Sequence, residues 1–372
     1  MECKICLFDT KNTDAVLDEE GVCNYCHLYQ QMEREYSLEN GSEKLELIVN
    51  EIKSCKKFGQ KYDCIIGVSG GIDSTFLLYT MVKKYDLKPL AVHFDNGWNT
   101  AIATNNMKSI CRAMDVDLEI YSVDNDEFDD IIMSFLKAGV LDIDAPTDIG
   151  LITTLYQKAD EYNINYIIEG HSFRTEGVQP LNWAYVDGKY IYDIHKKFGT
   201  KKMVTYPNLW ISKFVKWTAI KKIKRIRPLY YIDYNKNKVR EMLRDYGFID
   251  YNGHHHENKW SAFNYSYYLP KRAQIDGRLN EICSYLRRGL ITKDDACVIL
   301  KEPVEYNQEI IYEILQRLNM SQSDLDCLMD QPIKTWHEFK TYKCVFHKTK
   351  LIWYSLYKAG IVPKSFYVKY CK

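Results

Sequence analysis

The feature that most constrains the fold of this chain is an apolar run that leads directly into a glycine turn and then into a helical pattern. Residues 63–68 read Asp-Cys-Ile-Ile-Gly-Val, and Ser-Gly-Gly follows. The helical pattern begins near Ser74, a residue type that caps helices, and places Phe76, Leu77 and Met81 on one face. Strand, turn and helix in this order form the start of an α/β unit.

The same alternation continues through residue 169. Three further apolar runs are expected to be strands, at 89–94, 118–123 and 166–169. Helical patterns lie between the last two, near 126–138 and 148–162. Alternating strands and helices predict a parallel sheet covered on both faces, with ligands at the carboxyl ends of the strands.

The turn at residues 69–74 has the composition of a phosphate-binding loop. Its glycines let the backbone approach an anion, and the N–H groups at the helix start then face the phosphates. Asp73 cannot bind phosphate directly, so we expect it to fix the loop or to hold Mg²⁺. The string is neither a Walker A motif nor a dinucleotide fingerprint, and it resembles the PP-loop of ATP pyrophosphatases. The alternative interpretation of residues 69–74 is an ordinary turn between a strand and a helix. The nucleotide-binding residues expected here are Ser69, Gly70, Gly71, Asp73 and Ser74.

Polar residues also follow the second strand. The run His93-Phe94-Asp95-Asn96-Gly97 ends it, and the side chains of Asp95 and Asn96 can accept from and donate to a ribose or a base. A plain strand-terminating turn is the alternative. The nucleotide site is therefore expected to include His93, Asp95 and Asn96, together with Gly170 after the fourth strand.

Four cysteines near the N-terminus form two CxxC pairs, which are Cys3 with Cys6 and Cys23 with Cys26. Two such pairs fit a tetrahedral zinc site with four protein ligands, which leaves no position open for catalysis. A short segment with few large apolar residues needs such a staple to fold, so we expect structural Zn²⁺. An iron–sulfur cluster and unligated thiols are the alternatives.

The charge and composition of the chain limit the kinds of partner that we expect it to bind. The 372 residues carry 50 basic and 50 acidic side chains, whereas nucleic-acid-binding enzymes usually show a basic excess. A local basic face can still be concealed in a neutral total. The N-terminus has no apolar signal region, and no stretch approaches the roughly 20 apolar residues of a membrane helix. We therefore expect a cytoplasmic protein with no nucleic-acid and no membrane partner.

We expect three parts along the chain. Residues 1–40 would form a zinc-ribbon-like module, and residues 41–235 the α/β nucleotide-binding domain with its parallel sheet. Residues 236–372 are expected to be mainly helical and to serve the substrate or a partner.

A third set of polar strings follows the fourth strand. Residues 169–177 read Glu-Gly-His-Ser-Phe-Arg-Thr-Glu-Gly, and residues 194–202 read Ile-His-Lys-Lys-Phe-Gly-Thr-Lys-Lys. With the CxxC pairs and the loop, they resemble the N-acetyl sugar amidotransferase family, PP-loop enzymes of O-antigen (lipopolysaccharide) and nonulosonic acid biosynthesis. The resemblance covers residues 1–290 and departs at 258–263, where the family pattern has a Ser-x-x-Thr-Arg-Phe-like stretch.

The resemblance implies a reaction. ATP would adenylate the oxygen of a sugar acetamido group, and ammonia would then displace AMP to leave an acetamidino group. Loop amides, Mg²⁺ and a cation such as Lys201 or Arg174 would stabilise charge on the α-phosphate. His171 and Glu176 would position substrate or move protons. The alternatives are a strand-end histidine bonded to backbone and a solvated loop acid. The expected catalytic residues are Asp73, His171, Glu176 and Lys201.

The source of ammonia is expected to lie outside this chain. There is no room for a glutaminase domain, and no cysteine outside the CxxC pairs sits in a nucleophile-like strand–turn–helix context. Separate glutaminase and cyclase-like subunits are therefore predicted, as the resemblance also implies. The C-terminal part would bind the sugar, contact this partner or form a homodimer interface. The adjacent His254, His255 and His256 would bind substrate or metal, or lie in a solvated loop.

Other functions compete with this interpretation. A tRNA-thiolating PP-loop enzyme often carries zinc knuckles, but Cys64, Cys111 and Cys283 are isolated in the sequence and the charge is neutral. Two further functions compete with it. One is an ammonia-dependent enzyme that amidates a carboxylate, and the other is a non-catalytic ATP sensor. The particular sugar and its activating group are left open.

Overall fold

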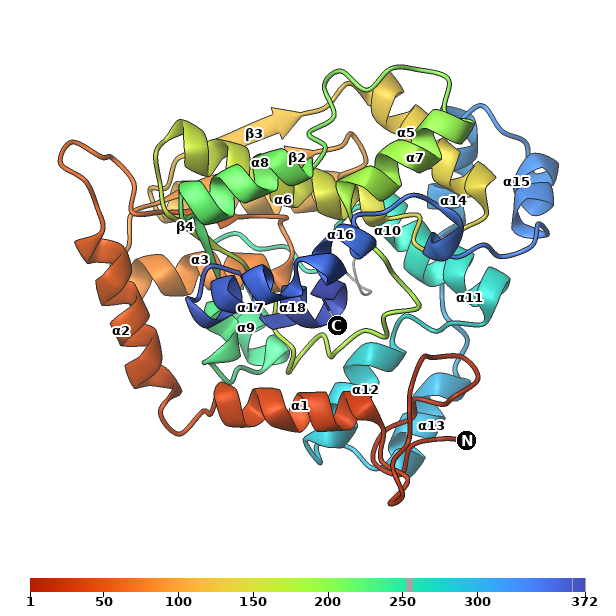
Figure 1. Cartoon of the computed structure of the whole chain (residues 1–372), viewed down its shortest axis with the longest axis horizontal. Coiled ribbons are helices and arrows are strands. Elements are labelled where there is room, and N and C mark those ends of the chain that lie inside the picture. Colours follow the sequence, from red (N-terminus) through yellow and green to blue (C-terminus); the bar gives the residue numbers. More distant parts are fainter. Residues whose placement is uncertain (252–256, 363, 372) are drawn as a thin grey trace.

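The computed structural model of the chain describes residues 1–251, 257–362 and 364–371. Its centre is a sheet of five parallel strands in the order β3-β2-β1-β4-β5 (Figure 1). The strands are β1 (Cys64–Gly67), β2 (Pro89–Asp95), β3 (Leu118–Ser122), β4 (Tyr166–Ile168) and β5 (Lys224–Ile226). The first four coincide with the apolar runs, which confirms the predicted α/β class and parallel sheet.

The sequence does not predict β5. This strand reads Lys-Arg-Ile, is only partly buried and pairs with β4 alone at the edge of the sheet. An edge strand needs no continuous apolar run, because one side of it faces solvent, and charged residues are common there.

Helices cover both faces of the sheet because side chains alternate along each strand. Cys64 and Ile66 of β1 pack into one core, and Ile65 between them packs into the other. The first core is covered by α2 (Gly41–Ser54), α3 (Ile72–Lys83), α4 (Ala101–Ala113) and α9 (Lys236–Arg244). The second is covered by α6 (Ala145–Glu161), α8 (Ile211–Val215) and the π-helix η1 (Lys216–Ile220).

The last three helices return to this second face. They are α16 (Lys343–Lys348), α17 (Lys350–Lys358) and α18 (Lys364–Cys371), drawn in dark blue across the front of Figure 1. Trp353 of α17 stacks on Phe214 of α8 with 5.6 Å between ring centroids, and Phe346 of α16 contacts Trp353 at 5.2 Å. The end of the chain is thereby packed onto the nucleotide-binding half.

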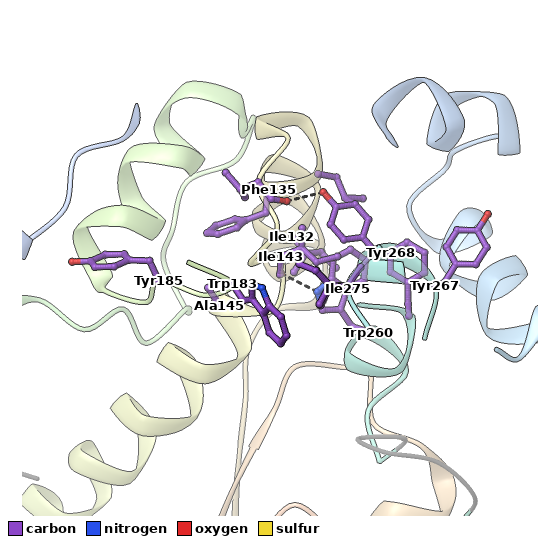
Figure 2. Packing of buried hydrophobic residues seen from close by; sticks show 14 of the residues in the cluster. Ile132, Phe135, Ile143, Ala145, Trp183, Tyr185, Trp260, Tyr267, Tyr268 and Ile275 are labelled. Carbon is purple, nitrogen blue, oxygen red and sulfur yellow. Dashed lines mark hydrogen bonds between the residues drawn. The ribbon is translucent and has the colours of Figure 1, made fainter. Parts of the chain in front are cut away.

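A separate apolar cluster joins the middle of the chain to the helices after residue 257. Figure 2 shows Trp260 and Tyr268 entering it opposite Phe135 of α5 (Asn125–Ala138). The Trp260 indole N–H donates to the Ile143 carbonyl at 3.1 Å, and the Tyr268 hydroxyl donates to the Val140 carbonyl at 2.7 Å. These bonds place the start of the C-terminal part beside the sheet.

The other helices complete the chain. They are α1 (Asn24–Glu35), α7 (Gly188–Phe198), α10 (Lys259–Phe263), α11 (Leu269–Ala273), α12 (Leu279–Arg287), α13 (Lys293–Lys301), α14 (Gln308–Arg317) and α15 (Gln322–Met329), with short turns η2 (Pro228–Tyr230), η3 (Asn264–Tyr268) and η4 (Trp336–Glu338). Among the residues that the structure describes, every helix is too short or too polar to span a bilayer. The domain boundaries at residues 40 and 235 stay predictions.

Candidate nucleotide-binding site

A cavity of about 1250 Å³ opens at the carboxyl ends of the strands. Its wall includes Val68 after β1, Phe94 near the end of β2, Gly170 after β4 and Arg227 after β5. This is the edge of a parallel sheet at which ligands bind.

The loop at residues 69–74 folds as an anion-binding turn at the mouth of α3. The Ser69 N–H donates to Ser74 Oγ at 3.2 Å, the Gly71 N–H donates to Ser69 Oγ at 3.2 Å, and the two hydroxyls lie 3.1 Å apart. Gly71 is the N-cap of α3 and brings no side chain over the helix end. The first N–H groups of the helix are therefore available to a phosphate.

Two glycines allow close backbone contacts around this loop. Gly70 has φ +82°, and a Cβ there would lie 2.1 Å from the Ala103 carbonyl oxygen. Gly170 brings the end of β4 against the same helix start, because its Cβ position lies 3.0 Å from Ser74 Cα. The loop conformation thus requires glycine at position 70.

Asp73 lies in the first turn of α3 and is held from the second half of the chain. The Tyr234 hydroxyl donates to one carboxylate oxygen, and Lys236 Nζ lies 3.7 Å from the other. Lys236 also contacts Glu281 at 3.3 Å. Burial raises the pKa of Asp73 to about 6, against the opposing charge of Lys236. The carboxylate is half-buried at the start of α3, where a bound Mg²⁺ would favour its ionised form.

His171 and Glu176 lie together in the cavity wall, as predicted candidates for substrate contact. Nδ1 of His171 is hydrogen-bonded to the Glu176 carboxylate, and the Glu176 N–H donates to the Ser172 carbonyl at 2.9 Å. A carboxylate bonded to one ring nitrogen orients the other toward a ligand. This pairing can position a substrate or relay a proton.

The expectation that Lys201 or Arg174 lies beside the phosphates is not met. Lys201 Nζ pairs with Asp126 at 2.8 Å on the surface, where the lysine side chain is 46% exposed. Its own backbone N–H donates to Asp130, which also accepts from His195, so this stretch secures the contact of α7 with α5. Arg174 is buried and bonds Glu33 at 2.9 Å, which ties α1 to the domain.

Lysines and arginines do line the cavity at other positions, which are Lys224, Arg225, Arg227, Lys236, Arg240 and Lys369. Two of the arginines flank Glu169, with Arg225 Nη2 at 2.5 Å and Arg227 Nε at 3.1 Å from its oxygens. Although burial raises it, these charges lower the pKa of Glu169 to about 2. Sequence reasoning missed all six of these cavity-lining cations. The alternating string Lys-Ile-Lys-Arg-Ile-Arg at 222–227 was the signal for an edge strand that carries arginines to the site.

The residues predicted after β2 divide into two groups. His93 borders the cavity, where its Nδ1–H donates to the Val68 carbonyl at 2.8 Å and its Nε2 accepts from Asn99 at 2.9 Å. Burial lowers the pKa of this imidazole. Asp95 and Asn96 build the turn instead, since Asp95 accepts from the Gly97 N–H at 2.9 Å and Asn96 from the Trp98 N–H at 3.1 Å.

The four N-terminal cysteines converge as predicted. Their sulfurs all lie within 4.8 Å of one another, with 3.8 Å between those of Cys3 and Cys26 and 3.6 Å between those of Cys6 and Cys23. Tetrahedral zinc–sulfur bonds of about 2.3 Å place sulfurs about 3.8 Å apart, so the cluster fits a metal of this kind. Arg287 of α12 donates to Cys26 Sγ at 3.3 Å and to Cys6 Sγ at 3.4 Å.

His254, His255 and His256 lie outside the described residues. Glu257, which follows them, lines the cavity and accepts from the Tyr251 hydroxyl at 3.2 Å. One of its carboxylate oxygens lies 3.3 Å from the position that a Cβ on Gly71 would occupy. The first described residue after the histidines therefore reaches the phosphate loop.

Two segments of the chain match known protein families. Residues 63–154 match the queuosine biosynthesis protein QueC, and residues 257–352 match the C-terminal domain of LPS biosynthesis protein WbpG-like proteins. The first segment holds β1 to β3 and the phosphate loop, and the second begins at Glu257.

An uncharacterized protein of Methanocaldococcus jannaschii, MJ1599, is 29% identical to this chain over 174 residues. The match covers 46% of this chain and 59% of the relative, so the chain spans less than two thirds of that protein's length.

Three solved structures show low overall similarity. NMN synthetase from Francisella tularensis is 16% identical, with a TM-score of 0.34, and covers 80% of this chain and 98% of its own. NH3-dependent NAD synthetase from Campylobacter jejuni is 11% identical, at 0.31, with 80% and 99% covered. The U34-tRNA thiolase NcsA from Methanococcus maripaludis is 13% identical, at 0.31, with 90% of each covered. With TM-scores this low, these similarities do not bear on the reaction.

The phosphate loop at the end of β1 lies within the segment that matches QueC, so this part of the chain is a QueC-like PP-loop domain. The predicted fold class is thereby confirmed. The chain thus combines a QueC-like PP-loop domain with a WbpG-like C-terminal domain, in agreement with the resemblance to enzymes of surface polysaccharide biosynthesis.

Proposed function

We propose that this chain is an ATP-dependent amidotransferase that converts the N-acetyl group of an activated sugar to an acetamidino group. One observation carries the proposal, namely that the WbpG-like domain begins at the PP-loop cavity. The Thr100 N–H donates to the Glu257 carbonyl at 3.0 Å, and the Asn258 amide donates to Asn96 at 2.9 Å. A domain of the LPS biosynthesis type thus shares the wall of the ATP site.

The size of the cavity supports an acceptor beside the nucleotide. Ligand sites commonly measure about 300–1000 Å³, and this cavity reaches about 1250 Å³. Its wall contains the aromatic rings of Tyr25, Tyr36, Tyr230 and Tyr265. Tyrosine offers an apolar face and a hydroxyl to a sugar ring.

The residues of the cavity suit an AMP-forming reaction. The acetamido oxygen would attack the α-phosphorus, and pyrophosphate would leave into the loop of Ser69 and Ser74. Lys236 and Arg227 lie in the same wall and would stabilise the charge that develops on the phosphates. Asp73 would hold Mg²⁺, which would supply positive charge to the phosphates during the displacement.

The second half of the reaction needs a base. Ammonia would add to the activated carbon, AMP would leave, and a proton would pass from the added nitrogen to the protein. The His171–Glu176 pair lines the cavity and is the donor–acceptor pair best arranged to take that proton.

The alternative of tRNA thiolation has less support. Cys64 and Cys111 are buried in the core of the sheet domain, and Cys283 is buried in the cluster that includes the four N-terminal cysteines. Within the described part of the chain, no cysteine lines the cavity.

The test is turnover with a panel of nucleotide-activated N-acetyl sugars, ATP, Mg²⁺ and an ammonium salt. We expect AMP and pyrophosphate to form only when the correct sugar is present, with a product whose mass reflects exchange of one oxygen for NH. Release of AMP that depends on tRNA, or that needs no acceptor, would contradict the proposal.

A matched pair of variants on α9 tests the assignment of the cation. Lys236→Gln should lower turnover by about 100-fold or more, because a charge aimed at the phosphates is lost. Lys238→Gln changes an exposed lysine on the same helix and should leave turnover unchanged. Equal effects of the two changes would remove Lys236 from the site.

A further inference from the structure

The last part of the chain concentrates positive charge that the neutral total conceals. Residues 339–372 contain no Asp, Glu or Arg. The same segment has eight lysines, which are Lys340, Lys343, Lys348, Lys350, Lys358, Lys364, Lys369 and Lys372. Lys348, Lys350 and Lys358 of this run are exposed, so a basic surface lies here although the chain as a whole is neutral.

Exposed apolar side chains lie among these lysines. Leu351 is 77% exposed and Ile352 is 60% exposed, and Lys348 and Lys350 beside them are also exposed. Leu351, Tyr354 and Lys358 follow each other at helical spacing, so they share one side of α17. We call the surface formed by Val345, Lys348, Lys350, Leu351, Ile352, Tyr354 and Lys358 the α17 face.

The α17 face is presented by a firmly packed support. Trp353 points the other way and is only 4% exposed. Its ring lies 5.2 Å from those of Phe346 and Phe366, and 5.6 Å from that of Phe214 on α8. Leu351 and Ile352 are therefore exposed although their helix is anchored to the core. An exposed apolar patch on a packed helix is typical of an interaction site.

We propose that the α17 face docks on an anionic phospholipid surface. Lysines draw such a helix to negatively charged headgroups, and the aliphatic side chains between them enter the interfacial layer. Tyr354 adds a ring whose apolar body and polar tip suit the same layer. The contact is peripheral and does not depend on the reaction proposed above.

The side-chain chemistry favours lipid over protein or nucleic acid. Protein interfaces are enriched in arginine and depleted of lysine. Nucleic-acid sites commonly use arginine for bidentate contacts, and they leave exposed aliphatic residues without a partner. The α17 face has lysine as its only basic residue type together with leucine, isoleucine and valine. Its lysine stems can lie along an apolar layer while their ammonium groups reach the phosphates.

The experiment is co-sedimentation of the full chain with vesicles. Phosphatidylcholine vesicles are compared with vesicles that also contain phosphatidylglycerol, at low and at high salt. We expect binding only to the anionic vesicles, and weaker binding at high salt because exposed charges are screened. Lys348→Gln with Lys350→Gln should weaken binding roughly 30-fold, since each lysine near the surface contributes about fivefold.

Matched variants test whether binding depends on the α17 face itself or on any exposed lysine or apolar residue. Leu351→Ser with Ile352→Ser should also reduce binding. The paired controls are Lys137→Gln with Lys301→Gln and Val298→Ser with Ile299→Ser, which alter exposed positions elsewhere and should bind like the parent chain. Circular dichroism checks that each variant is folded.

Three outcomes would overturn the proposal. The first is a parent chain that stays in the supernatant with anionic vesicles. The second is equal loss of binding in the control variants. The third is absence of vesicle binding together with binding of RNA, or self-association measured by light scattering, that the Lys348 and Leu351 variants abolish.

Discussion

At the scale of single residues, Asp73 is proposed to hold Mg²⁺ as an ionised carboxylate, whereas desolvation favours its protonated form. Burial raises its pKa from 3.8 to about 6, so the folded chain binds this proton more tightly than the unfolded chain. Stability contributed by the protonated form is present below pH 3.8 and is lost as the pH rises through about 6. Above that pH the nucleotide-free chain keeps a charged and largely desolvated carboxylate at an energetic cost.

Asp73→Asn removes this cost and should make the nucleotide-free chain more stable at pH 7, by about 1–3 kcal/mol. The gain should shrink as the pH falls below 6, and AMP formation should be lost. Urea unfolding across this pH range measures the first effect, and Asp126→Asn, an exposed site, serves as the control. A variant that is less stable than the parent at pH 7 would contradict the role given to burial.

Residue roles were only partly predictable from the sequence. Ser69, Gly71, Asp73, Ser74, His171 and Glu176 all line the cavity because they follow strand ends that the apolar runs reveal. Lys201 was misplaced because it follows a helix, α7, whose packing on α5 turns it to the surface. Lys236 reaches Asp73 from 163 positions along the chain, since α9 packs on α3. No local sequence pattern indicates a contact between residues so far apart in the chain.

At the scale of the element, the strand–loop–helix unit depends on the close approach of α4 to the loop. Gly70→Ala would place a Cβ against the Ala103 carbonyl and should displace the loop, with loss of ATP binding. Gly59→Ala has a similar positive φ of +79°, but no described atom lies within 4 Å of its Cβ position. It should lower stability by about 1 kcal/mol and keep ATP binding. Calorimetry of ATP binding separates them, and equal affinities would refute the requirement for glycine.

The cysteine module is a second element whose stability can be tested. Arg287 donates to two of the four sulfurs from α12, and a cation there offsets the charge of thiolates around a metal. Arg287→Met should weaken retention of zinc by about 10- to 100-fold, whereas Arg288→Met should not. Elemental analysis after dialysis against a chelator measures this, and the melting temperature should fall as metal leaves. Identical zinc content in both variants would contradict the prediction.

Elements with strong periodicity were predictable, and elements set by tertiary contacts were not. Strands β1, β2 and β4 are continuous apolar runs because both their faces are covered. The edge strand β3 is partly exposed, but its Leu118, Ile120 and Tyr121 still give an apolar pattern. The edge strand β5 and the return of α16 to α18 onto the sheet depend on partners far away in the sequence. Phe214 and Trp353 stack although they lie 139 positions apart in the sequence, and neither stands in a pattern that indicates the other.

At the scale of the whole molecule, the chain is proposed to use ATP at its own phosphate loop and to take ammonia from another protein. The isolated chain should therefore form product with ammonium salts and not with glutamine, since no cysteine in the described cavity wall can attack a glutamine amide. Rates with each nitrogen donor at equal concentration measure this. Comparable use of glutamine by the pure chain would show that the ammonia source lies within it.

The junction between the PP-loop half and the WbpG-like domain bears on how such chains can be recombined. The Thr100 N–H donates to the Glu257 carbonyl, and the Lys259 N–H donates to the Trp98 carbonyl at 2.8 Å. Both bonds join backbone to backbone, so they survive any change of side chain at these positions. Several side-chain pairs also cross the junction and must be inherited together. They include Asn96 with Asn258, Asp144 with Ser261, and Asp129 with Arg317. A chimera joined just before residue 257 should therefore exchange the C-terminal part between relatives only when these pairs are kept.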